Sequence, residues 1–226
     1  MDAPEIIKKL KSRFFELWRR CLAEQGEADP EPVWNELINH YTQSGRHYHG
    51  VGHLAHCLEL HDLAVAEMDD PDAVEMAIWF HDVVFEAQSR DNERRSAELF
   101  QRMAADRFGS AFVERVFRLV LVTDHRMSPA TRDDELVADI DLSGIALPWK
   151  SYLRDTEALR RENREIPDDR YYAAHQRFLN GLTARRRIFH SDFFHRRCES
   201  DARRNIDRYL RQLEAAGRIP GPAESP

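Results

Sequence analysis

The histidine-rich stretch RHYHGVGHLAH occupies residues 46–56, and WFHD follows at residues 79–82. If the first stretch is helical, His49 and His53 lie four residues apart on one face and can approach a common centre. The second stretch ends an apolar run with His81 and Asp82, a neutral imidazole next to a carboxylate. Nitrogen and oxygen donors of this kind suit a divalent transition metal better than calcium. The two stretches therefore predict a metal site carried by helices.

Apolar residues recur at helical spacing along most of the chain, and no segment shows sustained two-residue alternation. Helices are expected over residues 3–24, from Pro30–Pro32 to Ser44, from the histidine stretch to just before Asp69, over 73–80, 91–107 and 112–121, from Thr131 to Ser143, from Pro148, from Pro167, and over 199–213. Asp70 is expected to cap a helix, and Thr131 with Asp134 resembles a capping box. We therefore expect an all-α fold, a bundle of about nine to ten helices.

The chain has 226 residues, enough for one well-buried domain, and no stretch rich in Pro, Gly and Ser divides it. A single helical domain is expected over residues 1–216. Residues 217–226 contain three prolines and two glycines and are expected to be a disordered tail.

The charge balance limits the classes of partner. The chain carries 33 basic and 40 acidic residues, a net charge of -7. This acidic balance argues against polymeric nucleic acid as a partner and leaves phosphate binding to a local pocket. No apolar run approaches the roughly 18 residues that a membrane span needs, so no membrane association is expected.

The three cysteines, Cys21, Cys57 and Cys198, are widely spaced and form no Cys-x-x-Cys pair. An odd number at such spacing predicts neither a disulfide framework nor a zinc knuckle. This usage fits a protein of the reducing cytoplasm, where we expect the chain to be located.

The order of these motifs resembles the HD-domain superfamily of metal-dependent phosphohydrolases, which has a histidine, a later His-Asp doublet and a later aspartate, all on helices. The chain is most similar to a bacterial subgroup of predicted HD phosphohydrolases with an Arg-x-Tyr-His-x-x-x-His opening and a Phe-His-Asp doublet. Further matches are Asp91-Asn92-Glu93, Thr123-x-His125, Asp139-x-Asp141-Leu142, Arg160-x-Glu162 and Arg203-x-Asn205, so the resemblance covers most of residues 40–210. It implies an HD-type helical bundle.

Four residues match the metal ligands of that superfamily: His53, His81, Asp82 and Asp141. The resemblance implies that they hold a divalent ion, with Mn, Co, Ni, Mg, Fe and Zn as candidates. Asp139 is the competitor for the last position. The superfamily pattern places the ligand directly before a leucine or a basic-leucine pair, which favours Asp141.

A similarity to cyclic-nucleotide phosphodiesterases separates the roles of His49 and His53. In those enzymes a Tyr-His-Asn-x-x-x-His helix uses its second histidine as ligand and its first as proton donor. The resemblance thus implies that His49 is the general acid. Asp82 is expected to accept a proton as well, and Glu86 to orient the attacking water. Gly50 stands where relatives often have Asn or Thr, and it indicates close approach of another backbone or of the substrate.

Five further residues are predicted to contact the substrate: Arg46, Asn92, Glu93, His125 and Arg160. Arg46 can offer its planar fork to a phosphate, with an exposed salt bridge as the alternative. His125 can bind a phosphate oxygen or a second metal, or it can end a helix, where a cation suits the dipole. Arg160 can line the substrate pocket or belong to a structural ion-pair network.

The leading hypothesis from the sequence is a metal-dependent phosphohydrolase. Its substrate is expected to be a small phosphomonoester or phosphodiester, and superfamily analogy favours a nucleotide. The alternative is a non-catalytic regulatory HD protein that binds a metal or a nucleotide. A helical interaction protein with a structural metal is a third and weaker reading, because a ligand set with two carboxylates and no cysteine is atypical of structural zinc. The oligomeric state is left open, with a homodimer as one alternative.

Overall fold

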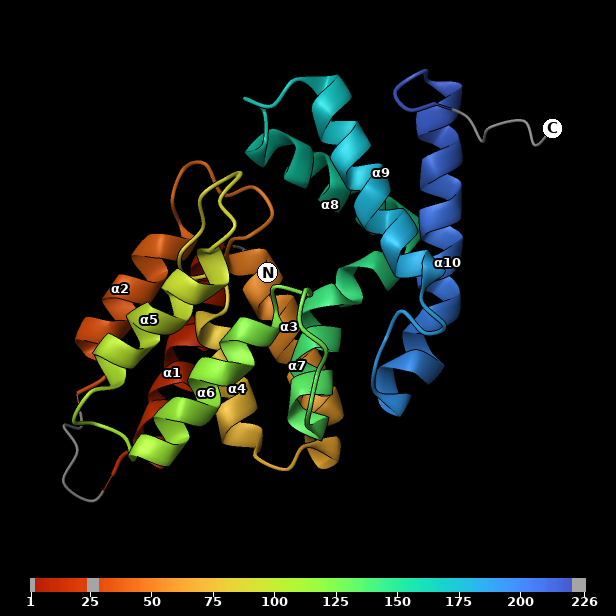
Figure 1. Cartoon of the computed structure of the whole chain (residues 1–226). Coiled ribbons are helices and arrows are strands. Elements are labelled where there is room, and N and C mark those ends of the chain that lie inside the picture. Colours follow the sequence, from red (N-terminus) through yellow and green to blue (C-terminus); the bar gives the residue numbers. More distant parts are fainter. Residues whose placement is uncertain (1–2, 24–28, 221–226) are drawn as a thin grey trace. The chain divides into compact units, whose positions relative to one another are not determined.

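The computed structural model describes residues 3–23 and 29–220, and in these ranges every regular element is helical and no strand occurs. The ten α-helices are α1 (Ala3–Cys21), α2 (Glu31–Tyr41), α3 (Val51–Ala64), α4 (Pro71–Phe80), α5 (Asn92–Ala104), α6 (Ser110–Val122), α7 (Arg132–Leu142), α8 (Trp149–Glu162), α9 (Asp168–Ala184) and α10 (Asp192–Ala215). Two short 3₁₀-helices, η1 (Val65–Glu67) and η2 (Ser143–Ala146), follow α3 and α7. The predicted all-α bundle is confirmed (Figure 1).

Two predicted helix starts are confirmed by their hydrogen bonds. The Asp70 side chain accepts from the Ala73 backbone N–H at the start of α4. At the start of α7, the Asp134 N–H donates to the Thr131 hydroxyl at 3.2 Å, and the Thr131 N–H donates to Asp134 Oδ2 at 2.9 Å. These reciprocal bonds satisfy backbone groups that have no partner within the helix.

The chain divides into two compact units, Met1–Asp141 (unit 1) and Leu142–Pro226 (unit 2). Each unit is described by itself, and the single domain expected over residues 1–216 stays a prediction. The expected disordered tail lies partly outside the described residues, since only its first four positions are described. Among these four, Ile219 is buried.

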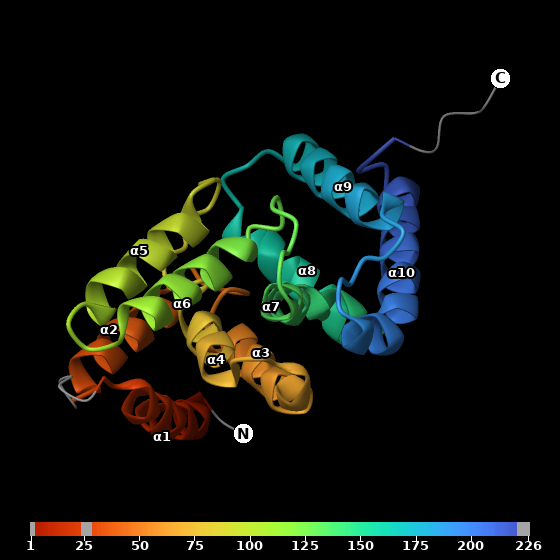
Figure 2. The same ribbon diagram turned by 60° about the horizontal axis from the view of Figure 1, so that its bottom comes forward.

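Helix α4 is the core element of unit 1. Every residue from Ala73 to Phe80 is buried, and the helix packs against α1, α3, α5 and α6 (Figure 2). The ring centroids of Phe14 on α1 and Trp79 on α4 are 5.2 Å apart, so these two helices pack through their aromatic side chains. Burying a large apolar side chain contributes about 1.5–3 kcal/mol. The core therefore fixes the end of α4, and with it the His81-Asp82 doublet that follows.

Unit 2 contains η2, α8, α9 and α10. The Asn205 side chain on α10 donates to the carbonyls of Ile145 and Leu147 at 2.9 and 2.8 Å, which attaches the η2 segment to α10. Tyrosine rings pack between α8 and α10, where the ring centroids of Tyr152 and Tyr209 are 5.7 Å apart. In the described part of the chain, no helix is long and apolar enough to cross a membrane.

The histidine helix begins later than the sequence indicated. Helix α3 starts at Val51 with Gly50 as its N-cap, so His49 lies in the preceding turn and not on the helix. The physical reason is the tight approach of Gly50 to the end of α2. A Cβ on Gly50 would lie 3.3 Å from the Tyr41 carbonyl oxygen, which confirms the close backbone approach expected at this glycine.

Candidate metal centre

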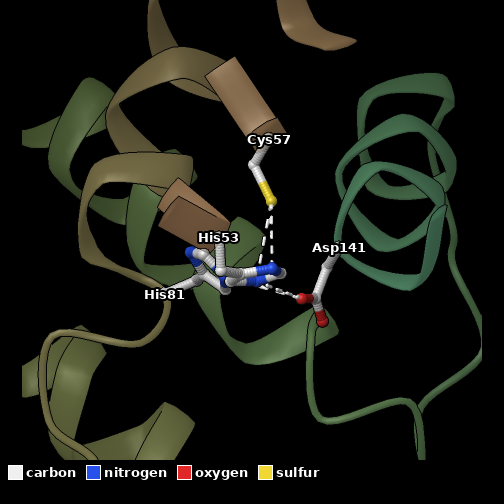
Figure 3. Close-up of side chains that lie close together, drawn as sticks. All are labelled: His53, Cys57, His81 and Asp141. Atoms are coloured by element: carbon white, nitrogen blue, oxygen red, sulfur yellow. Dashed lines mark hydrogen bonds and ion pairs between the residues drawn. The ribbon is translucent and has the colours of Figure 1, made fainter. Parts of the chain in front are cut away.

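Three segments of unit 1 deliver nitrogen and oxygen donors to one point. His53 projects from α3, His81 follows the last residue of α4, and Asp141 stands near the end of α7. His53 Nε2 lies 3.2 Å from His81 Nε2 and 3.1 Å from Asp141 Oδ1. His81 Nε2 lies 3.5 Å from the same carboxylate oxygen. Figure 3 shows the two imidazole rings side by side, with the Asp141 carboxylate at their edge.

These separations fit one shared cation. Two nitrogen or oxygen donors about 2.0–2.1 Å from a tetrahedral ion are about 3.3–3.4 Å from each other. The three distances among His53, His81 and Asp141 lie between 3.1 and 3.5 Å. The donor atoms are thus spaced as the ligands of one divalent ion are spaced.

Asp82 faces the same point. Its Oδ2 lies 3.1 Å from His81 Nε2 and 3.5 Å from His53 Nε2. This oxygen is buried beside the two imidazole nitrogens. A buried carboxylate is costly unless a positive charge neutralises it. The structure therefore brings all four sequence-predicted ligands together, and Asp82 supplies an oxygen that needs a cation.

The backbone fixes which nitrogen His81 presents. His81 Nδ1 lies 2.8 Å from the Ile78 carbonyl oxygen, a group that can only accept. The proton of the neutral ring is therefore on Nδ1, and the lone pair of Nε2 points to Asp82 and Asp141. Metal-binding histidines are generally oriented by a hydrogen bond from the ring nitrogen that does not bind the metal.

The electrostatics of the centre favour a positive charge. Burial opposes the charge on His81, but Asp82 and Asp141 outweigh it and raise the pKa of His81 well above its usual value. Burial also opposes the charge on Asp82, yet His81 and His49 lower the pKa of Asp82. A metal cation and a proton compete for the same imidazole lone pair, so this environment attracts either one.

Asp141 is held from its other side by His125. His125 Nε2 lies 2.9 Å from Asp141 Oδ2, while Oδ1 faces His53. His125 has a φ of 56°, in the left-handed region that costs a residue with a side chain about 1 kcal/mol or more. The histidines His125, His53 and His81 hold the pKa of Asp141 well below its usual range against the effect of burial. His125 thus orients the Asp141 carboxylate, and its predicted contact with substrate stays a prediction.

Cys57 is a donor that the sequence analysis did not assign to the centre. Its Sγ lies 3.6 Å from His53 Nε2 and 3.8 Å from His53 Nδ1. Together with His53, His81 and Asp141 it forms a group whose four donor atoms all lie within 4.8 Å of one another. The signal in the sequence was its position four residues after His53, on the same face of α3.

His49, the predicted general acid, lies beside the centre although it precedes the helix. Its ring stacks on Phe85 with centroids 4.2 Å apart, and its centroid is 6.0 Å from that of His53. His49 also contributes to the low pKa of Asp82. The imidazole is therefore near the carboxylate without belonging to the group of closely spaced donor atoms.

Arg46 joins the two motif stretches through the backbone. Its guanidinium donates to the carbonyls of Asp82, Val83 and His49 at 2.5, 2.7 and 3.0 Å. The carbonyls at a helix end have no partner within the helix, and Arg46 supplies one for the residues just after α4. The guanidinium, predicted to bind a phosphate, is here a brace between His49 and Asp82, and phosphate binding stays a prediction.

The loop after the doublet is held by Asn92. The Asn92 side chain accepts from the Glu86 N–H and donates to the Glu86 carbonyl, both at 3.0 Å. The Glu86 carboxylate is exposed and pairs with Arg95 at 2.7 Å. The predicted roles of Glu86 and Asn92 toward water and substrate therefore gain no support from these contacts.

Glu93 has a different environment. Burial, together with the nearby carboxylates of Asp82, Asp124 and Asp141, raises the pKa of Glu93. A carboxyl group that is influenced by two residues of the metal centre lies on its side of unit 1. Its predicted contact with the substrate stays a prediction.

Arg160, the last predicted substrate residue, belongs to unit 2. Its guanidinium donates to Asp168 Oδ1 at 2.6 Å and to the carbonyls of Asn163 and Ile166 at 2.5 and 2.9 Å. These bonds hold the turn between α8 and α9. The structural ion-pair alternative accounts for them, and substrate binding by Arg160 stays a prediction.

Comparisons with models of protein families, with curated proteins and with solved structures found no significant match. The geometry of the centre is therefore the basis for a functional assignment.

Proposed function

We propose that this protein is a metal-dependent phosphohydrolase that acts on a small phosphomonoester or phosphodiester, with a nucleotide as the favoured substrate. The observation that carries the proposal is the convergence of two histidines and two carboxylates from three segments of unit 1. Asp82 Oδ2 and Asp141 Oδ1 both lie within 3.5 Å of a histidine nitrogen. This donor set, in this order along the chain, is the one expected from the HD resemblance.

The four proposed ligands are His53, His81, Asp82 and Asp141. When bound, a divalent ion supplies Lewis acidity, which makes water a better nucleophile near neutral pH and polarises a phosphoryl oxygen. A purely structural zinc site is disfavoured, because such sites are built mainly from cysteine and histidine.

The proton transfers are assigned to side chains of the centre. His49 is proposed to donate a proton to the leaving alkoxide, and its stacking on Phe85 at 4.2 Å fixes the plane of the ring. Asp82 is ionised in this environment and is proposed to accept the proton that the attacking water gives up. The chain places no activated Ser or Cys nucleophile in this scheme, so direct attack by water is the proposed route.

The test is metal analysis of the purified protein, followed by a panel of nucleotides and general phosphatase substrates with added Mn, Co, Ni and Mg. Metal-dependent turnover that Asp141→Asn abolishes is the expected result. His56→Ala is the matched control, because His56 lies on α3 but outside the group of donor atoms. Metal binding with no turnover of any substrate would favour the regulatory alternative. Absence of metal binding would contradict the hydrolase and would leave only a nucleotide-binding regulator.

A further inference from the structure

We propose that Cys57 is the residue that sets the metal preference of this centre, by giving thiophilic ions such as Zn²⁺ and Co²⁺ a sulfur donor. Three donors, His53, His81 and Asp141, are common to every arrangement of the site. The fourth position is then shared between a hard donor, Asp82, and a soft donor, Cys57. This inference rests on the proposed metal centre but not on the proposed hydrolysis.

The position of the sulfur supports this assignment. Cys57 Sγ lies 3.6 Å from His53 Nε2. A sulfur about 2.3 Å and a nitrogen about 2.0–2.1 Å from one tetrahedral zinc ion are about 3.5–3.6 Å apart. The four donor atoms all lie within 4.8 Å of one another. A movement of the donor atoms by about 1 Å would bring them to the separations expected around one tetrahedral ion.

The surroundings of Cys57 differ from those of a cysteine that only fills a core. The residue is 1% exposed, and buried cysteines commonly serve as small apolar side chains. Here the sulfur points to the imidazole nitrogens of His53, and Figure 3 shows Cys57 and Asp141 approaching the two histidine rings from different directions. The two nearly equal distances, 3.6 Å to Nε2 and 3.8 Å to Nδ1, place the sulfur beside the His53 ring, next to the donor atoms of the candidate centre.

The type of donor atom in the fourth position determines which metal ions bind more tightly. Thiolate sulfur favours Zn²⁺ and other thiophilic ions, whereas carboxylate oxygen suits Mg²⁺ and Mn²⁺. Binding through Cys57 forms a metal–sulfur bond, breaks the S–H bond and releases that proton to solvent. A harder ion gains little from sulfur and is held by Asp82 with the three common donors.

The experiment uses cobalt as a spectroscopic probe of the full-length protein. Metal-stripped protein is titrated with Co²⁺, and a sulfur-to-cobalt charge-transfer band in the near ultraviolet is expected for the unmodified chain. Cys57→Ser should lose this band, and Cys21→Ser should keep it, because Cys21 lies on α1 outside the group of donors.

Competition between Zn²⁺ and Mn²⁺ gives the second readout. The ratio of the two affinities is expected to fall about 10- to 100-fold in Cys57→Ser, with the loss on the zinc side. Cys57→Ala, which keeps a small apolar side chain, should give the same loss. An unchanged ratio in both variants overturns the proposal.

A further variant protects the test against a folding failure at position 57. Cys21→Ser/Cys198→Ser leaves Cys57 as the single cysteine of the chain, and it should retain the charge-transfer band. Cobalt bound without that band in the unmodified protein overturns the role of Cys57 and leaves the metal centre standing. No binding of cobalt, zinc or manganese to the unmodified protein overturns the centre itself, and with it the proposed function.

Discussion

Glu75 and Asp82 are both largely buried carboxylates of unit 1, but the cations around them differ in kind. Glu75 accepts from Arg13 at 2.7 Å and from the Trp79 indole at 3.4 Å, with Arg20 at 3.5 Å. The Asp82 carboxylate instead faces imidazoles, with its Oδ2 3.1 Å from His81 Nε2 and 3.5 Å from His53 Nε2.

This difference separates an ion pair of the fold from a site for an exchangeable cation. A guanidinium is always charged, so the charge of Glu75 is compensated at every pH at which the protein is folded. An imidazole can be neutral and can give up its proton to a metal ion. A buried acid surrounded by histidines is therefore the place where a metal can enter, and a buried acid paired with arginine is not.

The largest effect is expected for the two histidines near the start of α3. The comparison predicts that His53 binds the metal ion and that His49 does not. His53→Ala should lose both bound metal and activity, because His53 Nε2 lies 3.1 Å from Asp141 and 3.2 Å from His81. His49→Ala should keep the metal and lose about 10²- to 10⁴-fold in kcat. Metal content and steady-state kinetics of the two variants are the measurements.

A substrate with a good leaving group gives the control for this pair. A nitrophenyl ester needs little protonation, so the defect of His49→Ala should shrink on it. Loss of metal from His49→Ala but not from His53→Ala would reverse the two assignments.

The next largest effect is expected at Glu75, the other carboxylate of the comparison. Glu75→Gln should lower the free energy of unfolding by about 2–3 kcal/mol, because it leaves Arg13 partly unpaired next to the core. Metal affinity should be unchanged. Asp141→Asn should show the opposite pattern, with metal binding lost and a smaller change in the stability of the metal-free protein. Urea unfolding and metal titration of both variants decide the point, and a parallel loss of both properties in Glu75→Gln would contradict the separation.

Arg46 extends the comparison, because it is a guanidinium beside the centre that donates to backbone carbonyls. Arg46→Lys keeps the charge but loses the fork that reaches Asp82 and Val83 together. Metal affinity is expected to fall about 10- to 100-fold, the usual range for residues that orient ligands. Arg95→Lys, at an exposed pair with Glu86, is the control and should leave the affinity unchanged. Equal affinities of the two variants would show that Arg46 does not position the doublet.

The smallest effect concerns His175 of unit 2, a partly buried histidine that packs against tyrosine rings. Its ring centroid lies 5.7 Å from Tyr171 and 5.4 Å from Tyr209, and burial lowers the pKa of His175 to about 4. Above about pH 6.5 the imidazole is neutral in both states, and its protonation does not affect stability. As the pH falls from about 6.5 to about 4, the unfolded chain binds the proton first, so the free energy of unfolding decreases and then levels off.

His175→Phe should remove this pH dependence. Between neutral pH and about pH 5, His175 is expected to lower the free energy of unfolding by about 1–2 kcal/mol. The variant should lack this contribution. Urea unfolding at the two pH values measures the difference. Equal pH dependence in both proteins would show that His175 is not buried as a neutral ring.

Residue patterns in the sequence were sufficient for the helices. Together with the HD resemblance they also singled out His53, His81, Asp82 and Asp141, which the structure brings close together. The capping box at Thr131 and the cap at Asp70 are local signals, because their hydrogen bonds join residues only three positions apart. The order of His53, His81 and Asp141 was informative because each donor stands at a helix or a helix end. Helix periodicity fixes the direction of such side chains once packing fixes the helices.

Contacts between distant segments were not predictable in the same way. Arg46 binds carbonyls 36 and 37 residues away, and a carbonyl acceptor leaves no trace in the side-chain pattern. Cys57 was not assigned to the candidate centre from the sequence, because a cysteine at helical spacing is typical of a core position. The start of α3 at Val51 depended on the approach of Gly50 to the Tyr41 carbonyl, a packing contact between α2 and α3.

The central claim is that a divalent ion binds at the point where His53, His81, Asp82 and Asp141 meet. Its most direct test is the titration of metal-stripped protein with Mn²⁺ and Zn²⁺, followed by calorimetry, on the unmodified chain, Asp141→Asn and Glu75→Gln. Binding to the unmodified chain and to Glu75→Gln, with none to Asp141→Asn, is the result that this account predicts. Equal binding to all three proteins, or binding to none, would contradict it.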